Sequence, residues 1–379
     1  SGNDNPIANM LRYKGFDFQD LSIDFRSSPQ RGMGGRGHIY KMTVDSIPID
    51  TVRFGIRQDS TRMNFRLLVQ NNKRNPRLVF KSQVNGYIDG NRVGADAQFF
   101  DKKGTKGLDM GIMAEMCDSG INVHLTPYTP LIGYKTFVLN DDNYVFLGRD
   151  GRVDAKVDLI AEDGTGVKVF SEKEDSTMLQ DLTVSINKLN LGQVTSVMPF
   201  MPQLSGMMNG DFHLMQDAEK QISVVSDMSV GGLAYEKMPM GDISSEFVYL
   251  QDGVDRHRVE ANIFRNGTEI GLLSGMYDNT NDGYLDATLD LMRMPLSLAN
   301  GFVPDQLIGF DGYAEGHLTV EGPLSSPLVN GELQLDSTYV KSVPYGVVMR
   351  CDDDPVRIVG SNLLLETYTL YGDNASPLT

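Results

Sequence analysis

The chain has 379 residues, with 50 acidic against 34 basic side chains and a formal net charge of −16. This charge repels nucleic-acid phosphates and disfavours contact with an anionic membrane surface, so nucleic acid is not expected as a partner. Gly is abundant, Asp, Asn and Ser dominate the polar residues, and Trp is absent. Such a turn-rich mixture favours many short strands and offers poor stacking surfaces for sugars.

The N-terminal part already shows the pattern that recurs along the chain. Residues 63–70 alternate, with Met63, Phe65, Leu67 and Val69 set against Asn64, Arg66 and Gln70. Residues 152–159 and 182–187 repeat this period of two. One face of each segment is therefore apolar and the other polar, as in half-buried antiparallel strands.

Tight turns separate these strands at short intervals, because each pair supplies the positive backbone dihedrals that hairpins need. The pairs are Asp150-Gly151, Asp163-Gly164, Asp252-Gly253, Asn266-Gly267 and Asp282-Gly283. Helical periodicity is confined to two short stretches, residues 191–198 and 295–300. The sequence therefore predicts an all-β, mostly antiparallel sheet with two short helices.

An internal repeat of about 105 residues organises the second half of the chain. Gly206 and Gly210 align with Gly312 and Gly316, and a helical stretch precedes each copy. We expect an N-terminal β segment at 1–80, a β-meander at 81–190, a first repeat copy at 191–294, and a second copy at 295–379 that ends early. Strands stacked in sequence order form an elongated body.

Several motifs have weak functional interpretations. Residues 32–37 satisfy a dinucleotide-binding pattern literally, but an alternating strand follows where a helix is needed, so a flexible glycine loop is favoured. Residues 278–283 resemble the start of a calcium loop, yet Leu289 stands where a bidentate Glu is required, so a hairpin turn is favoured. Cys117 and Cys351 indicate neither a zinc site nor a disulfide framework, and a single bridge between them stays open.

No constellation of catalytic residues stands out. The five histidines are scattered singly, without metal-ligand spacing, and His213 and His317 occupy nearly equivalent repeat positions. Carboxylates mostly alternate with apolar residues, as on a solvated face. We therefore expect a protein that is not an enzyme, with no cofactor and no metal. There is no 18-residue apolar run and no charged-then-apolar leader, so no bilayer-spanning helix is expected.

Together, several stretches resemble the TamB branch of the AsmA-like family, in its Bacteroidetes form. The resemblance covers the chain from about residue 80 onward, and the residues that carry it are 140–145, 181–186, 199–202, 204–210, 302–312, 316–323 and 327–335. It implies a long sheet curled into a taco-like groove with an apolar concave face. It also implies a place in the periplasm of a Gram-negative bacterium.

The family is linked to phospholipid transfer towards the outer membrane and to insertion of outer-membrane proteins. The implied partners are phospholipids, a TamA-like outer-membrane assembly barrel, and the inner membrane through an anchor that belongs to the full-length protein. The first hypothesis is thus a segment of an intermembrane lipid conduit. The alternative is a scaffold that assists outer-membrane protein assembly by pairing its sheet edges with a client strand.

The apolar faces are the candidate site, and the pattern alone favours a closed sandwich core over an open groove. With the resemblance, we expect a lipid-binding groove in which no side chain acts as acid, base or ligand. Its predicted lining residues are Phe65, Leu67, Val157, Leu159, Val184, Ile186, Leu289, Leu291, Leu333 and Leu335.

Overall fold

In the computed structural model the chain is nearly all β, with 75% of residues in strands and 3% in helices, and the pairings are antiparallel. This confirms the predicted fold class. The structure describes residues 16–28, 32–44, 47–72, 78–172, 178–198, 201–236, 238–280, 283–301, 307–352, 354–364, 369–372 and 377–378. Asp282 and the family-like residues at 199–200 and 302–306 lie outside these ranges.

The chain divides into two compact units, which are described separately below. Unit 1 comprises residues 1–171 and 192–202, and unit 2 comprises residues 172–191 and 203–379. The segment boundaries at 80, 190 and 294 follow sequence patterns and remain predictions.

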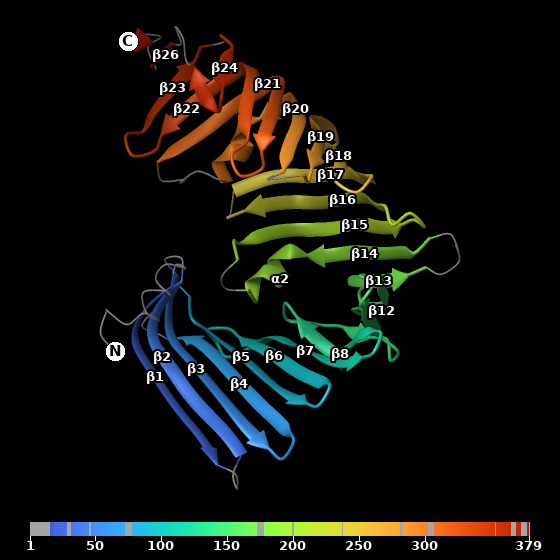
Figure 1. Cartoon of the computed structure of the whole chain (residues 1–379). Coiled ribbons are helices and arrows are strands. Elements are labelled where there is room, and N and C mark those ends of the chain that lie inside the picture. Colours follow the sequence, from blue (N-terminus) through green and yellow to red (C-terminus); the bar gives the residue numbers. More distant parts are fainter. Residues whose placement is uncertain are drawn as a thin grey trace. The chain divides into compact units, whose positions relative to one another are not determined.

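In unit 1, each of the first eight strands pairs with its sequence neighbour, and they lie side by side in chain order (Figure 1). They are β1 (Phe16–Ser28), β2 (Gly32–Val44), β3 (Ile47–Asp59), β4 (Arg62–Asn71), β5 (Phe80–Asp89), β6 (Arg92–Phe100), β7 (Lys106–Cys117) and β8 (Gly120–Ile132). The N-terminal strands therefore continue the antiparallel order of the strands that follow them.

The rest of unit 1 folds back on this sheet. β11 (Tyr144–Gly148) pairs with β8 and with β12 (Val153–Ile160), and β12 pairs with β13 (Gly166–Ser171). The short strands β9 (Lys135–Thr136) and β10 (Val138–Leu139) pair with β8 and β12, respectively. Val197, just after helix α2 (Leu191–Ser196), packs in a buried cluster with Phe80 and Phe99. The helical stretch thus closes part of unit 1.

In unit 2, consecutive strands again pair in chain order from β14 to β22 (Figure 1). They are β14 (Gln180–Asn190), β15 (Leu204–Gln216), β16 (Ile222–Tyr235), β17 (Met238–Asp252), β18 (Arg256–Arg265), β19 (Thr268–Asp278), β20 (Tyr284–Pro295), β21 (Ile308–Pro323) and β22 (Leu328–Ser342). A 3₁₀ helix, η1 (Leu296–Gly301), precedes β21.

Beyond β22 the sheet forks, because its two ends pair with different strands, β23 (Val347–Cys351) and β24 (Val356–Val359). β25 (Asn362–Leu364) pairs with β24, and β26 (Leu370–Tyr371) pairs with β23 and with β27 (Pro377–Leu378).

The predicted turns connect the expected strand pairs. Asn266 and Gly267 have φ values of 51° and 78°, which is the type I′ geometry of a two-residue hairpin. Gly151, Gly164, Gly253 and Gly283 also have positive φ. The turn residues in the sequence therefore predicted these strand ends correctly.

The internal repeat is visible in the backbone conformation of unit 2. Lys188 and Arg293 both have φ of 50°, and each lies within a register shift, between Ile186 and Leu189 in one copy and between Leu291 and Met294 in the other. A short helix follows each bulge. The next strand then carries the paired glycines, Gly206 and Gly210 or Gly312 and Gly316, all with positive φ.

One expectation is corrected. Residues 32–37 are not a flexible loop, because they form the first half of strand β2, and residues 34–37 pair with strands on both sides. The bridge that the sequence left open is not formed, since neither Cys117 nor Cys351 is in a disulfide. The alternation of residues 38–44 extends back through the glycines, which tolerate extended backbone.

We expect Gly210→Ala to lower the free energy of unfolding of unit 2 by about 2 kcal/mol. A Cβ at this position would lie 2.3 Å from the carbonyl oxygen of Asp227, and φ is 150°. Urea denaturation followed by circular dichroism measures the effect. The control is Gly231→Ala, whose Cβ would meet nothing closer than 3.9 Å. Equal loss in both variants would contradict this account of Gly210.

Candidate functional site

The strand register gathers the apolar side chains of unit 1 on one face. Partners directly opposite each other share a face, as do residues two apart on a strand. Leu67 lies opposite Phe54 and Val84, and the pairings carry this face from β1 to β13. It includes Leu21, Ile23, Phe25, Ile39, Val52, Phe54, Ile56, Phe65, Leu67, Val84, Ala97, Phe99, Ile112, Leu125, Val145, Val157, Leu159 and Val169. Four predicted lining residues thus share this face.

The opposite face of unit 1 is polar. Gln83 Nε2 donates to Gln98 Oε1 at 2.5 Å, and Gln98 Nε2 donates to Asp109 Oδ1 at 3.2 Å. These hydrogen bonds form a row of side chains that joins β5, β6 and β7 on the polar face. The sheet therefore separates an apolar surface from a hydrogen-bonded one.

Aromatic rings cover glycines on the apolar face of unit 1. The Phe54 ring lies 2.3 Å from the point where a Cβ of residue 37 would stand, and the Phe65 ring lies equally close to that of residue 86. Each Phe stands directly opposite its glycine on the neighbouring strand. A ring lying across a glycine fills the gap left by the missing side chain.

Solvent exposure varies along the apolar face of unit 1. Ile23 and Phe25 are 63% and 55% exposed, and Leu67 is 38% exposed. By contrast, Val157 and Leu159 are only 5% and 8% exposed, because they form a closed cluster with Phe137, Leu139 and Ala161 on the folded-back part of the unit. Of these four predicted lining residues, Leu67 is thus exposed and Phe65 half-buried, whereas Val157 and Leu159 are covered by the protein itself.

Unit 2 has its own continuous apolar face. Val184 lies opposite Phe212, Leu289 lies opposite both Leu273 and Leu318, and Gly316 links Leu291 to Leu333. The face includes Leu182, Val184, Ile186, Phe212, Leu214, Val224, Met228, Phe247, Val259, Ala261, Ile263, Leu273, Ala287, Leu289, Leu291, Leu318, Val320, Val329, Leu333, Leu335 and Val356. The six other predicted residues all lie on it; Leu291 is buried and the rest are half-buried.

The two repeat-related histidines lie on the opposite, polar face of unit 2. His213 Nε2 is 2.5 Å from Asp181 Oδ1, and His317 Nδ1 is 2.6 Å from Asp290 Oδ1. In each case the carboxylate belongs to the preceding strand. The two positions are only nearly equivalent, because His213 stands opposite Thr183 and contacts Asp181 diagonally, whereas His317 stands directly opposite Asp290.

A polar aromatic group lies at one end of the apolar face of unit 2 and was not predicted. The Tyr249 hydroxyl and His257 Nδ1 are 2.7 Å apart, and the His257 ring stacks between Tyr249 and Tyr277 with centroids 5.8 and 5.7 Å away. Burial raises the pKa of Tyr249. The sequence signal was present, because Tyr249 and His257 flank the Asp252-Gly253 turn. The group places hydrogen-bonding atoms beside an apolar surface.

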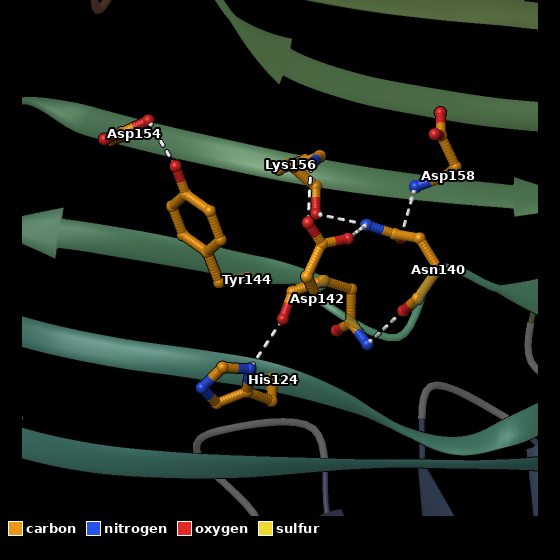
Figure 2. Close-up of polar contacts among 8 residues, drawn as sticks. His124, Asn140, Asp142, Tyr144, Asp154, Lys156 and Asp158 are labelled. Carbon is orange, nitrogen blue, oxygen red and sulfur yellow. Dashed lines mark hydrogen bonds and ion pairs between the residues drawn. The ribbon is translucent and has the colours of Figure 1, made fainter.

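The family-like segment at residues 140–145 forms a corner held by two amide side chains (Figure 2). Asn143 Oδ1 accepts from Leu125 N at 2.7 Å, and the Asn143 carbonyl lies 2.6 Å from His124 Nδ1. Asn140 Oδ1 accepts from Asp158 N at 2.8 Å. The amides thus satisfy strand backbone groups where β10 ends and β11 has not begun.

Charged side chains on the outer side reinforce the same corner (Figure 2). Lys156 Nζ lies 2.5 Å from Asp142 Oδ2, and this bond, together with one from Asn140, lowers the pKa of Asp142. Tyr144 Oη donates to Asp154 at 3.0 Å. These contacts fix the loop and lie on the wet surface. Within the described residues, no group of three or more His, Cys, Asp or Glu side chains is placed to hold a metal ion.

Residues 174–335 match the family described as TamB, N-terminal domain. This match covers 162 of the 379 residues and supports a TamB/AsmA-like family assignment. The match lies almost wholly in unit 2 and spans the first repeat copy and the start of the second. It begins well after residue 80, so the wider resemblance that the sequence indicates is supported over this part. No curated protein and no solved structure matches the chain.

The TamB match suggests a role in the translocation and assembly module. Proteins of the TamB family work with TamA-type partners in outer-membrane assembly. The family is associated with the cell envelope. Among the residues that the structure describes, none of the helices is long and apolar enough to cross a membrane.

We expect Asn143→Ala to destabilise unit 1 by about 1–3 kcal/mol, because the part-buried amide of Leu125 loses its acceptor when the buried Asn143 side chain is removed. The thermal unfolding midpoint measures the loss. Asn85→Ala is the control, since the Asn85 side chain has no hydrogen-bond partner among the described residues. An unchanged midpoint in Asn143→Ala would contradict the role assigned to this corner.

Asp163 should titrate far below an ordinary carboxyl group. Lys135 Nζ lies 2.7 Å from Asp163 Oδ2 and, with the amide of Thr165, lowers the pKa of Asp163 from 3.8 to about 2. Because the folded-state pKa is depressed, the pair stabilises the fold above about pH 4 and ceases to do so as the pH falls through about 2. Carboxyl NMR titration measures this.

In Lys135→Met the pKa of Asp163 should return towards 3.8. Lys168→Met, which removes the partner of Asp158 instead, should leave Asp163 unchanged. A wild-type Asp163 that titrates near 3.8 would show that the ion pair does not persist in solution.

Proposed function

We propose that the chain is a segment of a periplasmic conduit that shields phospholipid acyl chains on its apolar faces and so serves outer-membrane biogenesis. The observation that carries this proposal is the placement of the predicted lining residues. Within each unit they share a single continuous apolar face, although they come from strands far apart in sequence.

The energetics favour a lipid as the occupant of such a face. At about 0.8 kcal/mol per buried methylene, two acyl chains of about sixteen carbons cost on the order of 25 kcal/mol to hold in water. Half-buried Leu, Val, Ile and Phe side chains can take up that apolar surface. In unit 2 the face crosses nine successive strands, β14 to β22, which at about 4.8 Å per strand corresponds to roughly 38 Å.

The position of polar groups agrees with an amphipathic ligand. Tyr249, His257 and Tyr277 lie at an end of the apolar face, where their hydroxyl and ring nitrogen atoms can contact a headgroup while their rings contact the chain. Residues on the reverse face are solvated and take no part. No side chain acts as acid, base or metal ligand in this proposal.

The family supplies the setting of the proposal. A TamB/AsmA-like protein that carries phospholipid would work in the periplasm between an inner-membrane anchor of the full-length protein and a TamA-like outer-membrane barrel. Phospholipids are thus the proposed cargo, and the two membranes its source and destination.

A protein-assembly scaffold is the second candidate, and one observation favours it. Among the described residues, β1 pairs only with β2, so its other edge presents free backbone groups beside the exposed Ile23 and Phe25. An unpaired edge of this kind can add a strand from another chain. In that role the backbone of β1, rather than the apolar face, would be the binding element.

We expect phospholipid to co-purify with the protein and to be lost in Leu333→Asp/Leu335→Asp, because two carboxylates on the apolar face of β22 make acyl contact unfavourable. Native mass spectrometry with solvent extraction measures the bound lipid. The matched control is Asn330→Asp/Gln334→Asp, which places the same two charges on the reverse face of β22. Circular dichroism verifies that both variants are folded.

Equal lipid in both variants, or none in the wild type under gentle conditions, would count against the conduit. Binding of an outer-membrane protein strand, abolished by a proline in β1, would then favour the scaffold. The two outcomes depend on different parts of the chain.

A further inference from the structure

The acidic net charge of the chain conceals an uneven distribution. Unit 1 has 23 basic against 20 acidic residues, whereas unit 2 has 11 basic against 30 acidic ones. In residues 1–100 the balance is 15 basic to 9 acidic. A basic segment in an acidic chain is a feature that folding alone does not require, so the arginines on the polar face of β1 to β4 merit a functional explanation.

Four arginines surround two glycines on this polar face. In one cross-strand row, Arg26 on β1, Gly34 on β2 and Arg57 on β3 stand opposite one another. In the next row, Arg36 on β2, Gly55 on β3 and Arg66 on β4 do the same. Each glycine therefore lies between two arginines on the flanking strands, and the rows are two residues apart, about 7 Å. We call these six residues the arginine–glycine lozenge.

The glycines leave a hollow in the lozenge. A Cβ at residue 34 would meet only the Ile56 carbonyl oxygen at 3.7 Å, and one at residue 55 only the Gly35 carbonyl oxygen at 3.8 Å. A concavity of about 1330 Å³ lies along Arg26, Gly34, Arg36 and Arg57, and a second of about 460 Å³ adjoins it along Arg57 and Arg66. This contrasts with Gly37 and Gly86 on the apolar face, which aromatic rings cover.

The positive charge of the lozenge is only partly neutralised. Asp24 Oδ2 lies 3.2 Å from Arg26 and 3.6 Å from Arg36, and Asp59 lines the larger hollow. Within the described part of the chain, Arg57 and Arg66 have no ion-pair partner, and both are exposed. Each open glycine thus has one guanidinium group without an ion-pair partner beside it, that of Arg57 at Gly34 and that of Arg66 at Gly55.

We infer that the arginine–glycine lozenge binds phosphate groups, and that these are carried by the headgroups of an anionic lipid surface. Guanidinium groups bind phosphate oxygens in a bidentate manner, and a glycine floor lets the phosphate approach between them. The hollows are larger than one phosphate needs, and two rows about 7 Å apart suit neighbouring headgroups in a layer.

This site is distinct from the proposed lipid conduit, because it occupies the opposite face of the same strands. Arg57 and Arg66 alternate with Ile56, Phe65 and Leu67, whose side chains point to the apolar side. An acyl chain on the apolar face cannot place its own headgroup in the lozenge through the sheet. The inference therefore concerns contact with a membrane surface, and it stands or falls independently of cargo binding.

The test is co-sedimentation of the 379-residue chain with vesicles of phosphatidylcholine containing 30% phosphatidylglycerol. We expect binding that weakens as salt rises, with at least tenfold weaker binding in Arg57→Gln/Arg66→Gln. Gly34→Val/Gly55→Val fills the hollow without changing charge and should weaken binding as well. The matched control is Lys102→Gln/Arg149→Gln, which removes two exposed charges from unit 1 outside the lozenge.

Calorimetry with inorganic pyrophosphate separates the two sources of phosphate. Pyrophosphate binding that requires Arg57 and Arg66, without vesicle binding, would support the phosphate site and overturn the assignment to lipid. Equal vesicle binding by the lozenge variant and the control would overturn the site, as would a salt-sensitive dimer that is lost with Arg57 and Arg66 and binds neither probe. That dimer would assign the lozenge to the acidic unit 2 of a second copy.

Discussion

Pairing of each strand with its sequence neighbours is the constraint on which the rest of this structure depends. Antiparallel register keeps facing residues on one side of a sheet, and successive residues alternate between sides. Once residues 63–70 set their apolar positions on one face, every paired strand within the unit must keep the same parity, or a polar residue would enter the apolar face. Bulges near Lys188 and Arg293 change the local register, yet the apolar side chains before and after them remain on one face.

That parity explains how much could be predicted from the sequence. Alternation identified the strands, Asn266-Gly267 and its counterparts identified the turns, and together they determined that Phe65 and Leu67, or Leu289 and Leu333, would share a face. The solvent exposure of these side chains could not be predicted from the alternation. Val157 alternates just as Leu67 does, but the short strands β9 and β10 fold Phe137 and Leu139 over it. Whether an apolar face is open depends on such long-range packing, which has no local period.

The lozenge and the aromatic group show a second limit of sequence patterns. Arg57 and Arg66 are nine residues apart, and no motif connects them with Gly34 and Gly55. Only the joint register of four strands makes them neighbours. The net charge of −16 also hides how charge is divided along the chain, because the acidic residues concentrate in unit 2, where most of the TamB match lies. A whole-chain average describes neither unit.

The rings that lie over Gly37 and Gly86 bear on motion along the apolar surface. A sheet with bare glycines would be notched, and an alkyl tail settling into a notch would gain extra dispersion contacts there and have to lose them before moving on. With Phe54 and Phe65 spread across those positions, neighbouring places offer similar contact. On a surface of uniform depth, the binding free energy of an alkyl tail varies little from place to place. The barrier to sliding is therefore small even though the total binding free energy is large.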